Sequence, residues 1–176
     1  MSHGFTVLGG HFKRKTMPNH VLNLVNVDAM HLADLRAKMH GGIVDGEEIL
    51  VDFNKIVPEP EGLHDLPSND AIPEWYLWRC ANWGTKWNAY AFDYTPTGVT
   101  YLTAWAPAIN YLVALSKHLL DVDINLAWAD EDIGSDNHGI ATFRNGEITY
   151  YEQKDKLFAC DLMGLTADLI EAEDWK

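Results

Sequence analysis

The segment GIATFRNGEITYYE, residues 139–152, restricts the fold of this chain more than any other stretch. Its Asn145-Gly146 pair is the one that two-residue hairpin turns prefer, because both positions require a positive φ. The sequence therefore predicts two antiparallel strands joined by this turn. A two-residue turn also fixes the facing pairs, which are Arg144 with Glu147, Phe143 with Ile148, Thr142 with Thr149, and Ala141 with Tyr150.

Two strand-then-helix patterns precede this hairpin. NHVLNLVNV, residues 19–27, alternates in β-forming residues and predicts a strand with at least one buried face. Asp28 can then cap a helix, which Gly41-Gly42 ends. The second pattern is the strand GVTYLTAWA, residues 98–106, followed by the helix PAINYLVALSKHLL. The apolar stripes expected on the two helices are Leu32, Leu35 and Met39 on the first, and Ile109, Leu112, Val113 and Leu120 on the second.

Other segments complete the order of elements. EEILVDFNKIVPEP, residues 47–60, is typical of a short strand or extended segment that two prolines stop. PEWYLWRCANWG, from Pro73, predicts a helical turn closed by Gly84. VDINLAWA, residues 122–129, is a further strand, and residues 166–175 are expected to form a last, acidic helix.

The predicted order is therefore βαβ, insertion, βαβ, hairpin and helix. This order indicates an α+β protein, a ferredoxin-like split βαβ sandwich with a Trp-rich helical insertion and an added C-terminal hairpin and helix. We expect residues 1–16 to be a loose extension and residues 17–176 to form one domain. Within that domain the insertion is expected at about 58–88 and an acidic part at 121–176.

Motifs for cofactors, metals and catalysis are missing from the sequence. The isolated cysteines Cys80 and Cys160 exclude a four-thiolate iron–sulfur cluster within one chain, and such sparse cysteine is typical of a reducing compartment. No zinc-protease, nucleotide-binding or hydrolase motif occurs. His138 with Asp136 is the nearest approach to an acid–base pair, but no nucleophile stands beside it. We therefore expect no enzyme, no cofactor and no metal.

Neither a signal-peptide core nor an apolar run of transmembrane length is present, which predicts a cytoplasmic protein without membrane contact. The formal net charge is -13, and residues 121–176 hold 14 acids against 4 bases. Such a field repels nucleic-acid phosphates and anionic lipids and attracts basic protein surfaces, although solubility alone would also explain it. The acids expected to contact a partner are Asp121, Asp123, Asp130, Glu131, Asp132 and Asp136.

The stretch NWGTKWNAY, residues 82–90, allows two interpretations. A four-stranded sheet with helices on one face leaves its other face bare, and we favour an interpretation in which the Trp-rich insertion covers that face as core. The alternative is a platform for a small ligand or single-stranded nucleic acid, formed by Asn82, Trp83, Lys86 and Trp87. The negative charge disfavours direct nucleic-acid binding, because phosphate neutralisation supplies most of the nonspecific affinity.

Four stretches together resemble the ferredoxin-like YubB-type domain of plasmid and phage proteins. They are MPNHVLNLVNV at Met17, VDFNKIVPEPEGL at Val51, NWGTKWNAY at Asn82 and LTAWAPAINYLVALS at Leu102. The resemblance implies the split βαβ fold with a helical insertion and an origin in mobile genetic elements, and it implies no activity. His20 departs from it, because the family usually has Trp after MPN.

The sequence thus leads to a hypothesis about function. We expect a non-enzymatic accessory protein of a phage or plasmid that binds a host protein in the host cytoplasm. Its acidic residues would occupy a basic nucleic-acid-binding surface of that partner, as a counter-defence DNA mimic such as an anti-CRISPR-type inhibitor does. The oligomeric state stays open.

Overall fold

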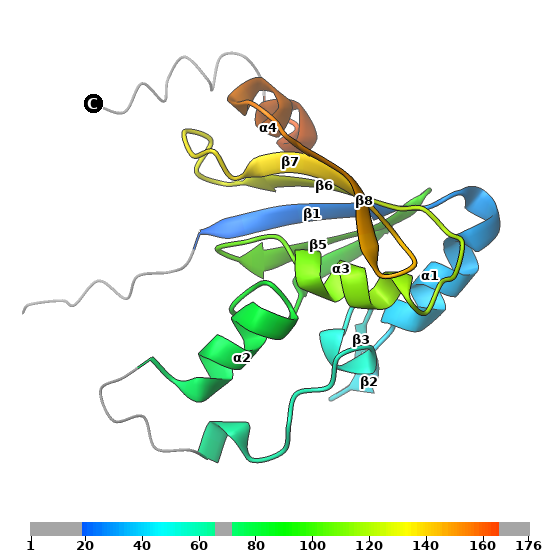
Figure 1. The fold of residues 1–176 in the computed structure, drawn as a ribbon, viewed down its shortest axis with the longest axis vertical. Coiled ribbons are helices and arrows are strands. Elements are labelled where there is room, and N and C mark those ends of the chain that lie inside the picture. Colours follow the sequence, from blue (N-terminus) through cyan, green and yellow to red (C-terminus); the bar gives the residue numbers. More distant parts are fainter. Residues whose placement is uncertain (1–18, 66–71, 166–176) are drawn as a thin grey trace, which may run out of the picture.

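The computed structural model describes residues 19–65 and 72–165, which form a six-stranded antiparallel sheet with helices packed on it (Figure 1). The order across the sheet is β4-β5-β1-β6-β7-β8. These strands are β1 (His20–Asn26), β4 (Tyr90–Thr95), β5 (Gly98–Ala104), β6 (Ile124–Asp130), β7 (His138–Arg144) and β8 (Glu147–Gln153). The helices are α1 (Leu32–Met39), α2 (Glu74–Asn82), α3 (Ile109–Ser116) and α4 (Lys156–Met163). The remaining elements are the hairpin β2 (Gly42–Val44) and β3 (Glu47–Ile49), and the 3₁₀ turns Ala29–His31, Phe53–Lys55 and Leu63–Asp65.

The connections between strands give the split βαβ arrangement that the sequence predicts. β1 lies between β5 and β6 and is antiparallel to both, while β4 flanks β5 on its other side. Helix α1 precedes β4 in the chain and α3 connects β5 to β6, so that each βαβ unit encloses a strand of the other. The fold is therefore a ferredoxin-like α+β sandwich, extended by β7 and β8.

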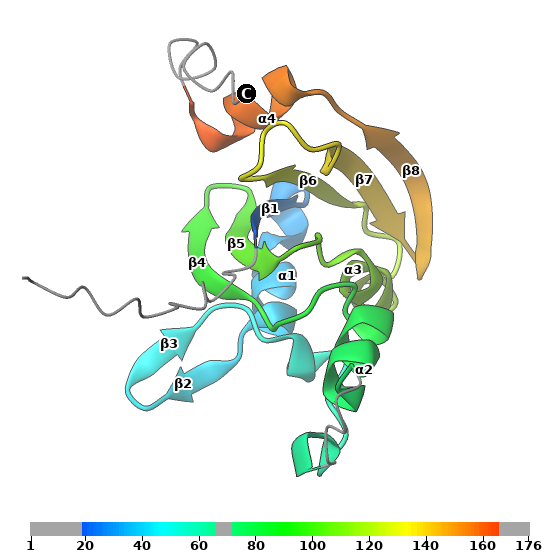
Figure 2. The same ribbon diagram turned by 90° about the vertical axis from the view of Figure 1, so that its left-hand side faces the viewer.

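The second strand of the first βαβ unit is not where the sequence placed it. Of residues 47–60, only Glu47–Ile49 form a strand, and this strand pairs with β2 in a separate sheet. β4 takes the expected place instead. Within β4, a register shift and a positive φ of 49° at Ala91 interrupt the alternation of side chains that would have marked the strand. Asp45 and Gly46, with φ values of 51° and 86°, form the two-residue turn that joins β2 to β3. The predicted insertion, 58–88, lies within the longer segment between α1 and β4, which Figure 2 shows away from α4.

The predicted hairpin is present, with one correction to its register. Asn145 and Gly146 have φ values of 52° and 86°, as a two-residue turn requires. Arg144 faces Glu147 and Phe143 faces Ile148, as expected. A bulge then shifts the register by one residue, so that the remaining predicted pairs are wrong and the observed ones are Thr142 with Tyr150 and Ala141 with Tyr151.

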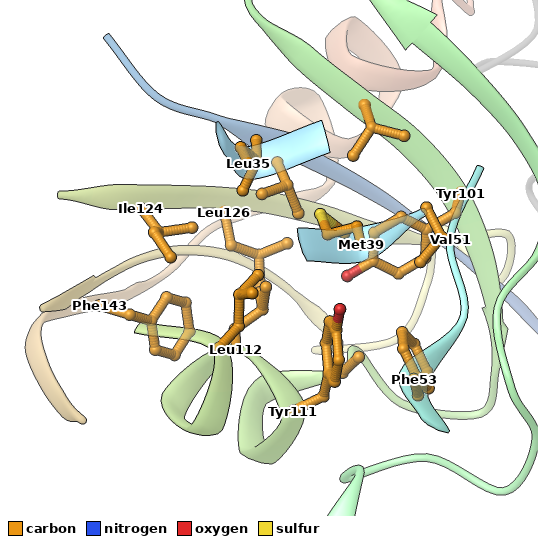
Figure 3. Packing of buried hydrophobic residues seen from close by; sticks show 14 of the residues in the cluster. Leu35, Met39, Val51, Phe53, Tyr101, Tyr111, Leu112, Ile124, Leu126 and Phe143 are labelled. Carbon is orange, nitrogen blue, oxygen red and sulfur yellow. The ribbon is translucent and has the colours of Figure 1, made fainter. Parts of the chain in front are cut away.

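The hydrophobic core lies between the sheet and helices α1 and α3 (Figure 3). Leu35 and Met39 from α1 are fully buried, as predicted. On α3 the buried positions are Tyr111, Leu112, Leu115 and Ser116, and the predicted Leu120 is instead 70% exposed. The prediction fails because α3 ends at Ser116, so Leu120 belongs to the loop before β6.

The helix ends differ in two places from what the sequence predicts. Asp28 precedes the 3₁₀ turn that leads into α1, but its side chain makes no capping hydrogen bond. Helix α4 was not predicted, although Asp155 caps it by accepting a hydrogen bond from the Phe158 N–H, and Gly164 ends it with a φ of 67°. The helix expected at 166–175 and the extension 1–16 lie outside the described residues.

Candidate functional site

The six predicted partner-binding acids fall into two groups at opposite ends of β6. Asp121 and Asp123 precede the strand, and Arg144 donates hydrogen bonds to both carboxylates, at 3.4 Å and 3.1 Å. The other four acids begin at the last residue of β6 and continue into the following turn. A strand of this length separates the two groups by about 20 Å, so they do not form one continuous surface.

Asp130 supports the turn after β6 rather than contacting solvent. Its side chain is 3% exposed. Its Oδ1 accepts a hydrogen bond from the Asp132 N–H at 2.9 Å, and its Oδ2 accepts one from Asn137 Nδ2 at 2.8 Å. The expectation that Asp130 contacts a partner is therefore wrong. Glu131, Asp132 and Asp136 are exposed, and we call these three residues the acidic turn.

His138 also belongs to the scaffold of this turn. The ring is fully buried. Nδ1 accepts a hydrogen bond from the Asp130 N–H at 3.1 Å, so Nε2 carries the proton and donates it to the Ile133 carbonyl at 3.2 Å. With both nitrogens bound to backbone groups, the ring has no atom left to serve as a general base with Asp136. Among the described residues, no three His, Cys, Asp or Glu side chains are grouped as metal ligands.

The end of β8 fixes the acidic turn from the other side. The Gln153 side chain donates a hydrogen bond to the Asp136 carbonyl at 2.9 Å, and the Lys154 N–H donates one to the His138 carbonyl at 2.9 Å. The turn is therefore bound to β6, β7 and β8, and its exposed carboxylates extend from a rigid base.

The aromatic segment divides between core and surface. Trp83 is 1% exposed, and its Nε1 donates a hydrogen bond to the Val57 carbonyl at 2.9 Å. Its ring packs edge-on against Phe53, with centroids 5.7 Å apart, and Phe53 in turn packs against Tyr111 of α3. Trp83 is therefore core, as favoured from the sequence, but it joins the helical layer instead of covering the opposite face of the sheet. A buried Trp83 cannot stack on an external ligand.

The other proposed platform residues lie nearer the surface. Asn82 is at the end of α2, where its Nδ2 donates a hydrogen bond to the Trp78 carbonyl at 2.8 Å. Lys86 reaches over two indole rings, with Nζ 5.0 Å from the Trp87 centroid and 4.1 Å from the Trp105 centroid. Trp87 itself is half-buried.

Lys86 and Trp105 form part of a cavity of ≈ 340 Å³ that sequence reasoning did not find. We call it the aromatic groove; its lining residues are Ile72, Pro73, Trp75, Tyr76, Lys86 and Trp105. Trp105 was predicted only as the end of a strand. Its position directly after β5 and before Ala-Pro was the available signal, because residues that follow a strand into a helix often carry function.

The split βαβ topology of the sheet defines a ferredoxin-like α+β domain. A family model described as "Ferredoxin-like domain in Api92-like protein" matches residues 82–173, and the chain belongs to this family. Among solved structures, the crystal structure of a protein api92 from Yersinia pseudotuberculosis is similar, with a TM-score of 0.45 and 12% sequence identity. That match covers 61% of this chain and 41% of the other. No curated protein matches. Among the described residues, no helix combines the length and apolar character needed to cross a membrane.

Proposed function

We propose that the protein is a non-catalytic binding protein whose acidic turn contacts a basic, nucleic-acid-binding surface of a host protein. One observation carries this proposal: Glu131, Asp132 and Asp136 are exposed together, and no basic side chain of the described residues lies within salt-bridge distance of them. By contrast, Asp121 and Asp123 at the other end of β6 share Arg144. The acidic turn is therefore the better candidate for an external cation.

The rigid base of the acidic turn supports the same proposal. Asp130 and His138 hold the turn from inside, so the exposed carboxylates keep their spacing without a partner. Ordering a flexible loop on binding costs free energy, and a preordered turn avoids most of that cost. Lys and Arg side chains that bind phosphates also bind carboxylates, because both are anionic oxygen acceptors. An origin in a phage or plasmid, and a role in blocking a host nucleic-acid-binding complex in the cytoplasm, are part of this proposal.

The proposal is tested by capture of bacterial lysate proteins on the immobilised protein at low salt, followed by elution with duplex DNA. We expect nucleic-acid-binding proteins to elute, because DNA competes for the same cations. The triple variant Glu131→Gln, Asp132→Asn and Asp136→Asn should retain much less of them. Glutamine at position 131 can still accept the hydrogen bond that Glu131 Oε1 receives from the His20 N–H.

The matched control is the double variant Asp121→Asn and Asp123→Asn, which removes charge at the opposite end of β6. It should retain the captured proteins at nearly the wild-type level. If the triple variant captures the same proteins as the wild type, or if DNA displaces none of them, the acidic turn is not the binding surface.

A further inference from the structure

Trp105 presents a large apolar ring to solvent from a strained backbone. Its φ is 70°, a left-handed conformation that costs a non-glycine residue about 1–2 kcal/mol. Two hydrogen bonds hold it there: its N–H donates to the Asn19 carbonyl at 2.9 Å, and its carbonyl accepts from Asn137 Nδ2 at 3.0 Å. The side chain is nevertheless 42% exposed, so burial of the indole ring does not offset the cost of the backbone strain. Backbone strain of this kind is concentrated at binding sites.

The wall opposite Trp105 is also aromatic. Helix α2 contributes Trp75 and Tyr76, and the Tyr76 and Trp105 centroids are 6.1 Å apart at an interplanar angle of 73°. Trp75 and Tyr76 stand nearly perpendicular to each other, at 86°. Edge-to-face surfaces of this kind favour a further aromatic ring, and the volume of ≈ 340 Å³ lies at the lower end of the range for ligand sites.

The shape of the aromatic groove favours one side chain of a larger molecule. Binding sites for free small molecules enclose most of the ligand surface. With 42% of Trp105 exposed, the aromatic groove is open to solvent and cannot enclose a ligand in this way. A polypeptide that lies over the opening can place one ring in the groove while the rest of its chain stays in solvent.

The polar groups of the aromatic groove indicate the charge of its ligand. Lys86 supplies a cation, and no carboxylate of the described residues lies within salt-bridge distance of it. An anion next to the bound ring would therefore complement Lys86. A nucleobase fits less well, because its polar edges would meet walls of rings, a proline and an isoleucine and would lose hydrogen bonds to water.

We propose that the aromatic groove binds the carboxyl-terminal aromatic residue of a partner polypeptide. The ring lies against Trp105 and Tyr76, and the terminal carboxylate pairs with Lys86 Nζ. This site is separate from the acidic turn and does not depend on the function proposed for it.

The test uses three small phenylalanine derivatives that carry different charges. N-acetyl-phenylalanine is the anion that mimics the proposed terminus, N-acetyl-phenylalaninamide is neutral, and phenylalaninamide is a cation. Each is titrated into ¹⁵N-labelled full-length protein while the indole N–H signals are followed by NMR, with Trp105 assigned from the Trp105→Phe variant. We expect a saturable shift of the Trp105 signal, with the anion binding about fivefold more tightly than the neutral amide, as an exposed ion pair allows.

Two variants separate the roles of charge and ring. Lys86→Met keeps an apolar stem over Trp105 and should abolish the preference for the anion. Trp105→Ala, followed through the indole signal of Trp75, should bind none of the three probes. The control is Leu77→Ala, an exposed position of α2 that does not line the aromatic groove, and it should bind like the wild type.

Several outcomes would overturn the proposal. These are no saturable shift at Trp105 with the anion, equal or tighter binding of the amide or the cation, or a preference for the anion that survives in Lys86→Met. Tighter binding of adenosine monophosphate than of N-acetyl-phenylalanine would also overturn it, and would assign the aromatic groove to nucleotides.

Discussion

Asn23 is a polar residue on the buried side of β1, and its amide connects three elements. Nδ2 donates a hydrogen bond to Thr103 Oγ1 of β5 at 2.8 Å, and Oδ1 accepts one from the Ala108 N–H at 3.3 Å, immediately before α3. The side chain is fully buried. A buried amide with satisfied hydrogen bonds specifies a position more closely than an apolar residue does, because its partners must match. Asn23 therefore sets where α3 begins on the sheet.

We predict that Asn23→Ala lowers the free energy of unfolding by about 1–3 kcal/mol, because it leaves the Thr103 hydroxyl and the Ala108 N–H buried without this partner. Urea denaturation followed by circular dichroism measures the change. Asn26→Ala is the control, since Asn26 accepts one hydrogen bond from Thr97 at an exposed site, and it should cost less than about 1 kcal/mol. Equal losses in the two variants would contradict a special role for Asn23.

At the scale of elements, the pairing of β1 with β5 requires a glycine at the start of β5. Gly98 faces Asn26 across the pair, and a Cβ at position 98 would stand 1.7 Å from the Val25 carbonyl oxygen. That obstacle is backbone in the centre of the sheet, so no side-chain movement can relieve it. Glycine in a strand often marks such a close approach.

We predict that Gly98→Ala destabilises the protein by about 3 kcal/mol or more, because the central strand pair must separate. The measurement is the midpoint of thermal or denaturant unfolding. Gly134→Ala is a matched control in the turn after β6, where the nearest atom to an added Cβ is an Asp132 side-chain oxygen at 3.4 Å. A Gly98→Ala protein as stable as Gly134→Ala would show that β5 does not approach β1 this closely.

A partly buried ion pair joins helix α2 to the segment that precedes it. Arg79 donates two hydrogen bonds to the Glu59 carboxylate, at 2.8 Å and 2.7 Å. Burial by itself raises the pKa of Glu59, but the hydrogen bonds and charges of Arg79 and His64 outweigh it and hold the pKa below the ordinary value of 4.5. Because the folded pKa is the lower one, the pair stabilises the fold above about pH 4.5 and loses this contribution as the pH falls.

We predict that Glu59→Gln costs about 1–3 kcal/mol of unfolding free energy at pH 7, because a partly buried, charge-assisted pair is broken. The difference between wild type and variant should shrink as the pH is lowered toward 3, since protonated Glu59 is also neutral. Denaturant unfolding at a series of pH values measures both effects. A difference that stays constant from pH 7 to pH 3 would mean that Glu59 is not stabilised as the carboxylate.

Some elements can be predicted from the sequence and others cannot, for physical reasons. The hairpin turn was predictable because Asn145-Gly146 determines it locally. The bulge between Thr142 and Phe143 was not, because no turn residue marks it; it places Tyr151 opposite Ala141, with its ring 5.5 Å from that of Trp128. Helix α4 had readable caps in Asp155 and Gly164, and these local signals were sufficient to predict it.

For the candidate sites too, the sequence predicts local features but not tertiary contacts. The sequence identified the exposed carboxylates of the acidic turn, but charge alone could not show that Asp130 is buried inside it. It grouped Lys86 with Trp83 and Trp87. Trp87 does lie beside Lys86, but Trp83 is buried, and the ring nearest to Lys86 is Trp105, which the fold brings from the end of β5. Contacts between residues distant in sequence depend on the tertiary fold, and no local sequence pattern predicts them.

At the scale of the whole molecule, the two candidate surfaces share one end of the sheet. Asn137 connects them, because its Nδ2 donates hydrogen bonds both to Asp130 Oδ2 and to the Trp105 carbonyl. On the same edge, the Glu131 N–H donates a hydrogen bond to the His20 carbonyl at the start of β1. A partner that bound the acidic turn could therefore reach the aromatic groove without crossing the molecule.

The net charge of -13 acts on the whole fold. Like charges held close together in the compact state repel one another, and added salt screens this repulsion. We predict that raising NaCl from about 0.02 M to about 0.3 M increases the melting temperature by about 2–4 °C, equivalent to about 1 kcal/mol for a chain of this size. Differential scanning calorimetry measures the shift, and choline chloride should give the same increase if screening rather than sodium binding is the cause. A melting temperature that falls with salt would mean instead that attraction within ion pairs such as Glu59–Arg79 outweighs the general repulsion.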